Sequence, residues 1–144
     1  MKIELVLAVT QSLEELNALK RQAPDEFFIL EKPGQTNVLL LNPEKFQGQF
    51  KEPIVYELGK AGKQLAGKHI YQVDFGYQDD VESSLIDLAN DHGVLAFDPR
   101  GKAQGMYWTF WESQAELDHF LTSDNYQAMK QLMKDPFATV YTNN

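Results

Sequence analysis

The chain has 144 residues, of which 43% are hydrophobic and 24% are charged, values typical of a globular protein. Its formal net charge of −8 disfavours binding to nucleic acids and to anionic membranes, because their phosphate groups would be repelled. The absence of cysteine excludes a disulfide framework and a thiol nucleophile. The apolar stretches are strand-sized and the amino terminus lacks a signal-peptide pattern, so we expect a cytoplasmic protein without a membrane span.

The first part of the chain predicts strands and one well-delimited helix. Ser12 and Glu15 have the spacing of a capping box, in which the Ser side chain accepts the backbone N–H three residues on. Pro24 ends the helix that follows. Pro33-Gly34 is a turn signal between two apolar runs. The strands predicted around these signals are residues 2–9, 26–31 and 37–41.

Residues 53–65 are predicted to form a helix. Pro53 suits the first helical turn, where its missing N–H has no intrahelical partner to lose. Gly59 and Gly62 oppose this, since each weakens a helix by about 1 kcal/mol relative to Ala.

The second part of the chain alternates strands with helices. Asp79 with Glu82 and Ser113 with Glu116 have capping-box spacing, and each is followed by apolar residues at helical intervals. The second of these helices is interrupted at residues 122–124 and then resumes. Strands are predicted at residues 68–76, 94–97, 105–111 and 138–142.

Side-chain alternation assigns faces to two of these strands. Gln72 shares a face with Ile70 and Asp74. On residues 105–111, Met106, Trp108 and Phe110 face one way, whereas Tyr107, Thr109 and Trp111 face the other. Either both faces of the strand pack into hydrophobic layers, or one of the two faces lines a pocket for a flat apolar ligand.

The element order βαββα followed by βαββαβ indicates an α+β protein built from two ferredoxin-like units. We place them at residues 1–66 and 67–144. Each antiparallel sheet needs a cover on the face that its helices leave open, and two sheets packed as an α/β barrel would supply it around a central cavity. One chain could achieve this alone as a pseudo-dimeric monomer, or two chains could do so as a homodimer.

The residues themselves point to no metal site. His69, His92 and His119 lie far apart in the sequence, and none has a second ligand at metal-binding spacing. The glycines and lysines of residues 59–68 do not have the spacing of a phosphate-binding loop. We therefore expect no metal. The binding partner that we expect is a small-molecule ligand, held in the cavity between the sheets.

The carboxyl-terminal half carries a distinctive pattern. Residues 107–113 form an aromatic strand ending in Trp-Glu-Ser, residues 115–118 begin a helix, and residues 123–126 make a Ser-centred break before an aromatic residue. This pattern resembles the antibiotic biosynthesis monooxygenase (ABM) superfamily of dimeric α/β barrels. Residues 28–41 and 50–59 are similar to the first part of two-part proteins of Gram-positive bacteria, which include heme-degrading monooxygenases and TRAP-like signalling proteins.

The resemblance implies a set of site residues. Heme-degrading members use an Asn on the first strand, with a Trp and an iron-ligating His on the last helix, and these positions correspond to Gln72, Phe120 and Lys130. Gln72 is the implied catalytic residue, while Phe120 and Lys130 take the implied cofactor-binding positions. A protonated ammonium does not ligate iron, so the cofactor is unknown, with heme the one that the resemblance implies. His119 would need a shifted register to replace Lys130. Alternatively, Gln72 and Lys130 are ordinary polar residues at a cavity edge or in solvent.

The resemblance leads to two functional hypotheses. The chain is an ABM-type monooxygenase acting on a flat aromatic or porphyrin-like substrate held in a cavity between sheets. Alternatively, it is a non-catalytic member of the same fold family that binds a small molecule or regulates another process. A weaker third hypothesis is a scaffold whose acidic surface contacts a basic partner.

Overall fold

The computed structural model describes residues 1–144 except the side chain of Asp79. Eight strands, four α-helices and two short 3₁₀ helices, η1 and η2, follow one another along the described chain. In chain order they are β1 (Lys2–Leu7), α1 (Leu13–Lys20), β2 (Phe27–Lys32), β3 (Gln35–Leu40), η1 (Pro43–Phe46), β4 (Ile54–Ala61), β5 (His69–Gly76), η2 (Asp79–Val81), α2 (Glu82–Leu88), β6 (Gly93–Phe97), β7 (Gln104–Trp111), α3 (Gln114–Leu121), α4 (Asp124–Gln131) and β8 (Lys134–Asn143).

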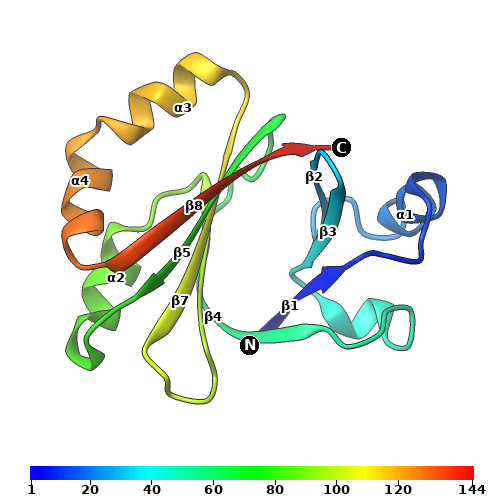
Figure 1. The fold of residues 1–144 in the computed structure, drawn as a ribbon, viewed down its shortest axis with the longest axis horizontal. Helices are drawn as coiled ribbons and strands as arrows, with labels where there is room; N and C mark the ends of the chain where they lie inside the picture. Colours follow the sequence, from blue (N-terminus) through cyan, green and yellow to red (C-terminus); the bar gives the residue numbers. More distant parts are fainter.

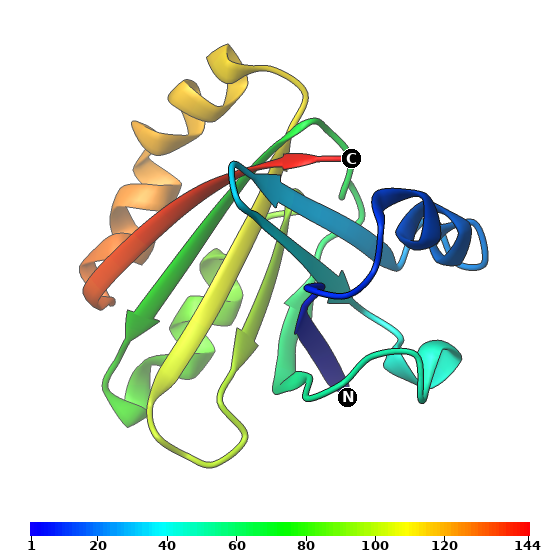
Figure 2. The same ribbon diagram turned by 45° about the vertical axis from the view of Figure 1, so that its right-hand side comes forward.

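The strands close into an antiparallel barrel in the order β1-β3-β2-β8-β5-β7-β6-β4. The four strands of the first half of the chain are neighbours, as are the four of the second half. The halves join where β2 pairs with β8 and where β4 pairs with β6. In Figures 1 and 2, α2, α3 and α4 lie against the second half of the barrel, whereas α1 lies on the far side of the molecule. The predicted α+β class and barrel are confirmed, and the division at residue 66 remains a prediction.

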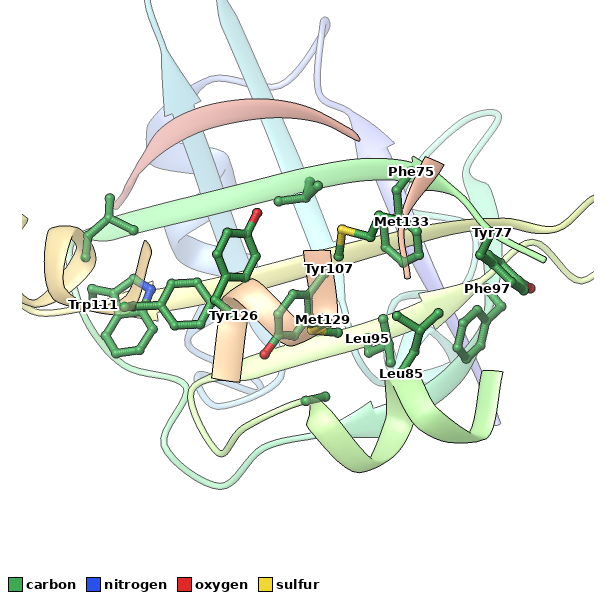
Figure 3. Close-up of a cluster of buried hydrophobic side chains, with 14 residues drawn as sticks. Phe75, Tyr77, Leu85, Leu95, Phe97, Tyr107, Trp111, Tyr126, Met129 and Met133 are labelled. Atoms are coloured by element: carbon green, nitrogen blue, oxygen red, sulfur yellow. The ribbon is translucent and has the colours of Figure 1, made fainter. Parts of the chain in front are cut away.

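The outer face of the second half of the barrel packs against the helices. Side chains of β5, β6 and β7 meet α2, α3 and α4 there in a helix-side cluster, part of which Figure 3 shows. The opposite half has an equivalent layer beneath α1 and η1. The buried members of the helix-side cluster are Val73, Phe75, Tyr77, Leu85, Ala89, Leu95, Phe97, Tyr107, Trp111, Leu117, Phe120, Tyr126, Met129 and Met133.

Packed side chains fill the interior of the barrel, in place of the predicted central cavity. Every strand contributes to this interior cluster, and Trp108 and Phe110 are fully buried in it. The rings of Phe28 and Phe110 lie 4.8 Å apart, and those of Tyr56 and Trp108 lie 5.9 Å apart. An eight-stranded barrel is just wide enough for side chains to fill, so the expectation of a chamber between two sheets is corrected.

The predicted helix at residues 53–65 is wrong, because the segment contains β4. Its residues Ile54, Val55 and Tyr56 are typical strand formers, and β4 pairs with β1 on one side and β6 on the other. The register shifts between Leu58 and Lys60, which places Gly59 at a bulge. A Cβ at Gly59 would lie 2.6 Å from the Phe97 ring, so glycine is needed for this close approach.

Most of the remaining elements follow the predictions, although β8 begins at Lys134 and not at residue 138, and the Glu116 carboxylate accepts the N–H of Glu112 and not that of Ser113. Ser12 and Glu15 form the predicted capping box of α1, and the Ser113 hydroxyl accepts the Glu116 N–H at the start of α3. Ser123 caps α4 after the predicted break. The predicted cap at Asp79 lies outside the described side chains.

Candidate functional site

Gln72 points into the barrel, on the face that alternation assigns to it. Its side chain is 5% exposed, and its Oε1 accepts a 2.7 Å hydrogen bond from Trp108 Nε1. The amide also hydrogen-bonds Asp74 and the Tyr141 hydroxyl, and the amide of Asn37 donates to the same hydroxyl over 3.2 Å. Gln72 is therefore the centre of a polar network that runs through the interior cluster.

Phe120 lies on the other face of the sheet, in the helix-side cluster. It is part of a row of rings, in which His92 stacks on Trp111 at 4.6 Å, Trp111 lies 4.8 Å from Phe120, and Phe120 lies 4.7 Å from Tyr126. Figure 3 shows Trp111 and Tyr126 at one end of the cluster, away from Tyr77 and Phe97. The sheet separates this row from Gln72, so the two residues do not share a pocket.

A pocket of about 410 Å³ opens at the end of this row, between α3, the start of α4 and the loop before β6. Its volume lies within the usual range for small-molecule sites. Two of the three histidines of the chain line it. The lining residues are Asn90, His92, Trp111, Glu116, His119, Phe120, Ser123 and Asn125. We call this hollow the α3 pocket.

Local hydrogen bonds hold the walls of the α3 pocket in place. The His92 N–H donates to Asn90 Oδ1 over 2.9 Å, and the His92 carbonyl accepts the Phe110 N–H, also over 2.9 Å. The Asn125 amide donates to the Leu88 carbonyl and so joins the start of α4 to the end of α2. The imidazole of His92 thus projects from a loop that is anchored to β7, and the start of α4 beside it is anchored to α2.

Trp111 has a buried polar atom with no hydrogen-bond partner among the described residues. The side chain is 8% exposed, and its Nε1 is inaccessible to solvent. Buried N–H groups are nearly always paired, so an unpaired one beside a pocket calls for an explanation. Trp111 is also one of the residues that line the α3 pocket, so the unpaired donor belongs to a side chain of the pocket wall.

Tyrosine hydroxyls deeper in the helix-side cluster remain protonated at neutral pH. Burial raises the pKa of Tyr107 to about 12, although its oxygen accepts the Asn90 N–H over 3.1 Å. Burial, together with Tyr71, also raises the pKa of Tyr126. Neither hydroxyl provides a base at neutral pH, so a base in the α3 pocket has to come from His92, His119 or Glu116, which line it.

Lys130 is exposed on α4 and does not line the α3 pocket. The positions that the resemblance assigns to heme therefore do not converge: Gln72 lies inside the barrel, Phe120 in the helix-side layer and Lys130 on the surface. These residues do not fit a heme held in that way. Among the described side chains, no group of three or more His, Asp or Glu residues could hold a metal ion.

Sequence reasoning missed the participation of His92, His119 and Trp111 in one pocket. Alternation placed Trp111 on the face opposite Trp108, which is correct. His92 and His119 are 27 residues apart in the sequence, and no local spacing indicates that they meet. The sequence feature nearest to this site was the Trp-Glu-Ser segment, which connects the end of β7 to α3.

Comparison with solved structures gives many neighbours for the whole chain. A heme-degrading enzyme from Listeria monocytogenes has a TM-score of 0.70 at 9% identity and covers 100% of both chains. An uncharacterised ferredoxin-fold protein related to antibiotic biosynthesis monooxygenases, also from L. monocytogenes, has a TM-score of 0.67 at 11% identity and covers 99% of this chain and 94% of its own. A major regulator of staphylococcal pathogenesis has a TM-score of 0.64 at 16% identity and covers 98% of both chains.

These likenesses establish the fold. It is the fold of ABM-related ferredoxin-like proteins, as the sequence resemblance implied, and the neighbours include both an enzyme and a regulator. No protein-family model matches the sequence, and no curated protein matches it either. No helix in the described part of the chain is both long and apolar enough to cross a membrane.

Proposed function

We propose that the α3 pocket binds a flat aromatic small molecule and that the chain oxygenates it as an ABM-type monooxygenase. The observation that carries the proposal is the unpaired buried N–H of Trp111, a residue that lines one pocket together with His92 and His119. Neighbours of the same fold include a heme-degrading enzyme and a protein related to antibiotic biosynthesis monooxygenases, which supports this class of chemistry.

The lining residues would hold such a substrate in a defined orientation. The imidazole of His92 is half-exposed and stacks on Trp111 with an interplanar angle of 26°, so a flat ring can extend the row by packing against it. A carbonyl or phenolate oxygen of the substrate would accept the hydrogen bond of Trp111 Nε1. This donor would favour negative charge on that oxygen.

The chemistry needs a base and a substrate that can supply its own electrons. An imidazole of the pocket removes a proton from a carbon conjugated with the bound carbonyl, and the resulting carbanion passes electrons to O₂. For a methylene substrate the balance is CH₂ + O₂ → C=O + H₂O. One oxygen atom enters the product, the other leaves as water, and O₂ accepts the four electrons that the carbon loses. No reductant is required.

A non-catalytic role is the second candidate. The solved neighbours include a major regulator of staphylococcal pathogenesis, at 16% identity. The filled barrel and the divergent positions of Gln72, Phe120 and Lys130 agree with a protein that binds a ligand without transforming it. In this case the α3 pocket would bind the same class of flat ligand, and occupancy would alter a contact of the surrounding helices.

Oxygen uptake with anthrone separates the two candidates, since anthrone is flat and has an acidic methylene conjugated with a carbonyl. We expect protein-dependent uptake of one O₂ per anthrone with formation of anthraquinone. In the double variant His92→Gln/His119→Gln the rate should fall by about 100-fold, the lower range for loss of a general base. His69→Gln is the matched control, because His69 lies outside the pocket.

Hemin tests the porphyrin version of the proposal. A Soret shift on titration, followed by product formation with a reductant, would support a porphyrin-like substrate. The absence of any shift would restrict the substrate to smaller flat aromatics. If anthrone and hemin both bind without being consumed, the non-catalytic candidate is correct, and if neither binds, the assignment of the α3 pocket as a ligand site is wrong.

A further inference from the structure

A second pocket, of about 450 Å³, lies at one mouth of the barrel, away from the α3 pocket. It lies beside the starts of β4 and β7 and the end of β5, and residues 98–100 form one side of it. Ile54, Tyr56 and Met106 give it apolar walls, and Asp74 is the inward-facing carboxylate at its edge. We call it the mouth pocket.

Asp74 has no cationic partner. It is half-buried, and none of the ion pairs among the described side chains involves it. Lys102 and Lys134 border an adjacent hollow that Asp74 shares, yet neither forms an ion pair with it. Burial raises the pKa of Asp74, and the Gln72 amide opposes the rise through a hydrogen bond. Removing part of a carboxylate from water without a charge partner is unfavourable, and a ligand of opposite charge would offset this cost.

The one guanidinium of the mouth pocket is already paired. Arg100 contacts Asp98 through Nε at 3.0 Å and a terminal nitrogen at 2.8 Å, and its backbone N–H donates to the same carboxylate over 2.9 Å. These hydrogen bonds lower the pKa of Asp98 to about 2. The charges of Asp98 and Arg100 therefore cancel, and the pocket retains the single negative charge of Asp74.

Tyr56 supplies an aromatic wall that stays neutral. Its ring meets Trp108 edge to face at 5.9 Å, so its orientation is fixed by the interior cluster. Burial raises the pKa of Tyr56 to about 12, and the carboxylates of Asp74 and Asp98 act in the same direction. The electron-rich face of a phenol ring attracts cations when it lies near them.

We propose that the mouth pocket binds a small organic cation, an ammonium group carried on an apolar body. Asp74 would be its charge partner, and Tyr56 and Met106 would pack against the apolar body. One unpaired carboxylate in an otherwise charge-balanced hollow with apolar walls on one side favours a monocation and disfavours neutral and anionic molecules. This proposal is independent of the function assigned to the α3 pocket.

Gln72 becomes a positioning residue in this site. The indole N–H of Trp108 is a donor only, so the oxygen of the Gln72 amide faces Trp108 and its NH₂ group faces Asp74 and Tyr141. The amide thereby holds the Asp74 carboxylate from the interior side and leaves its other oxygen lone pairs for a ligand. Gln72→Glu removes the amide donor and places a second acid beside Asp74, so it should shift the pH dependence of cation binding to higher pH.

Calorimetric titration with matched probes tests the proposal. Benzylammonium, benzyl alcohol and benzoate have similar size and differ in charge. We expect benzylammonium to bind at least about tenfold more tightly than the other two, because a hydrogen bond to a charged group is worth that much or more. Equal binding of benzyl alcohol, or no binding of benzylammonium up to about 10 mM, would overturn the proposal.

Variants identify the site that binds the probe. Asp74→Asn should weaken benzylammonium binding by about tenfold or more. Glu4→Gln is the matched control, since it removes one half-buried carboxylate from a different pocket and should leave binding unchanged. If Asp74→Asn fails to fold, the native protein serves: binding of benzyltrimethylammonium, whose charge is permanent, should weaken as the pH falls and Asp74 becomes protonated. Binding that stays constant with pH, or an unaffected Asp74→Asn variant, contradicts the assignment.

Discussion

The two tryptophans of the chain allow one prediction to be worked out in detail. Trp108 and Trp111 lie on the same strand and face opposite sides of the sheet. The N–H of Trp108 is paired with Gln72 Oε1, whereas the N–H of Trp111 has no partner among the described residues. Changing each to Phe removes the same atoms from two well-packed sites, so the comparison isolates the hydrogen bond.

The expected difference in unfolding free energy follows from the burial of Gln72. Trp108→Phe leaves Gln72 Oε1 without its donor in a side chain that is 5% exposed, and an unsatisfied buried acceptor costs about 1–3 kcal/mol. Trp111→Phe leaves no polar group unsatisfied. Both variants lose a similar packing contribution, because the native Trp108 and Trp111 are only 0% and 8% exposed. Trp108→Phe should therefore be the less stable variant by about 2 kcal/mol, or roughly 4–8 °C in Tm.

Urea unfolding followed by far-UV circular dichroism measures both variants under identical conditions. Equal m-values would confirm that the comparison concerns the same folded and unfolded states. If Trp111→Phe were destabilised as much as Trp108→Phe, or more, the Trp111 N–H would have an interaction that the structure does not show, and the argument for a ligand acceptor at that atom would be lost.

Further predictions concern packing, pH and ligand binding. Gly93→Ala should destabilise the protein by about 1–3 kcal/mol in urea unfolding, because the new Cβ would lie 2.5 Å from the buried Tyr107 ring; an unchanged midpoint would refute this. The folded-state pKa of Asp74 is raised above its ordinary 3.8, so its ionisation opposes folding. Asp74→Asn should thus stabilise the protein at pH 7, and the gain should disappear below about pH 4 in a pH series. Phe120→Ala should weaken aromatic-ligand binding by fluorescence titration, whereas Lys130→Ala should not, and a reversed order would contradict the pocket assignment.

Strand faces were predictable because alternation is a local property. The opposite faces of Trp108 and Trp111, and the shared face of Gln72 and Asp74, follow from a period of two residues along one strand. The capping pairs Ser12 with Glu15 and Ser113 with Glu116 are local in the same sense. Features fixed by contacts three or four residues apart are visible in the sequence.

The segment of residues 53–65 shows where local reasoning fails. Pro53 is compatible with a helix start, but Ile54, Val55 and Tyr56 are β-branched or aromatic residues that favour a strand. The strand forms because β1 and β6 provide partners on both sides, and Gly59 creates the bulge that lets β4 pass Phe97. Those partners are distant in the sequence, so the outcome depends on the tertiary structure.

The site was harder to predict for the same reason. Gln72 and Phe120 were grouped by a resemblance that fixes sequence positions, yet the sheet separates them. His92 and His119 line one pocket because α3 lies beside the end of β7 and the loop before β6. No spacing in the chain encodes that arrangement.

The central claim, that Trp111 Nε1 donates to a flat aromatic ligand in the α3 pocket, can be tested by a single measurement. The chain has two tryptophans, so its ¹H–¹⁵N spectrum has two indole resonances, which the Trp108→Phe and Trp111→Phe variants assign. Titration with anthraquinone, a flat ring system with carbonyl acceptors, should move the Trp111 resonance downfield and leave that of Trp108 in place. A stationary Trp111 resonance at saturating ligand, or movement of Trp108 alone, would contradict the account.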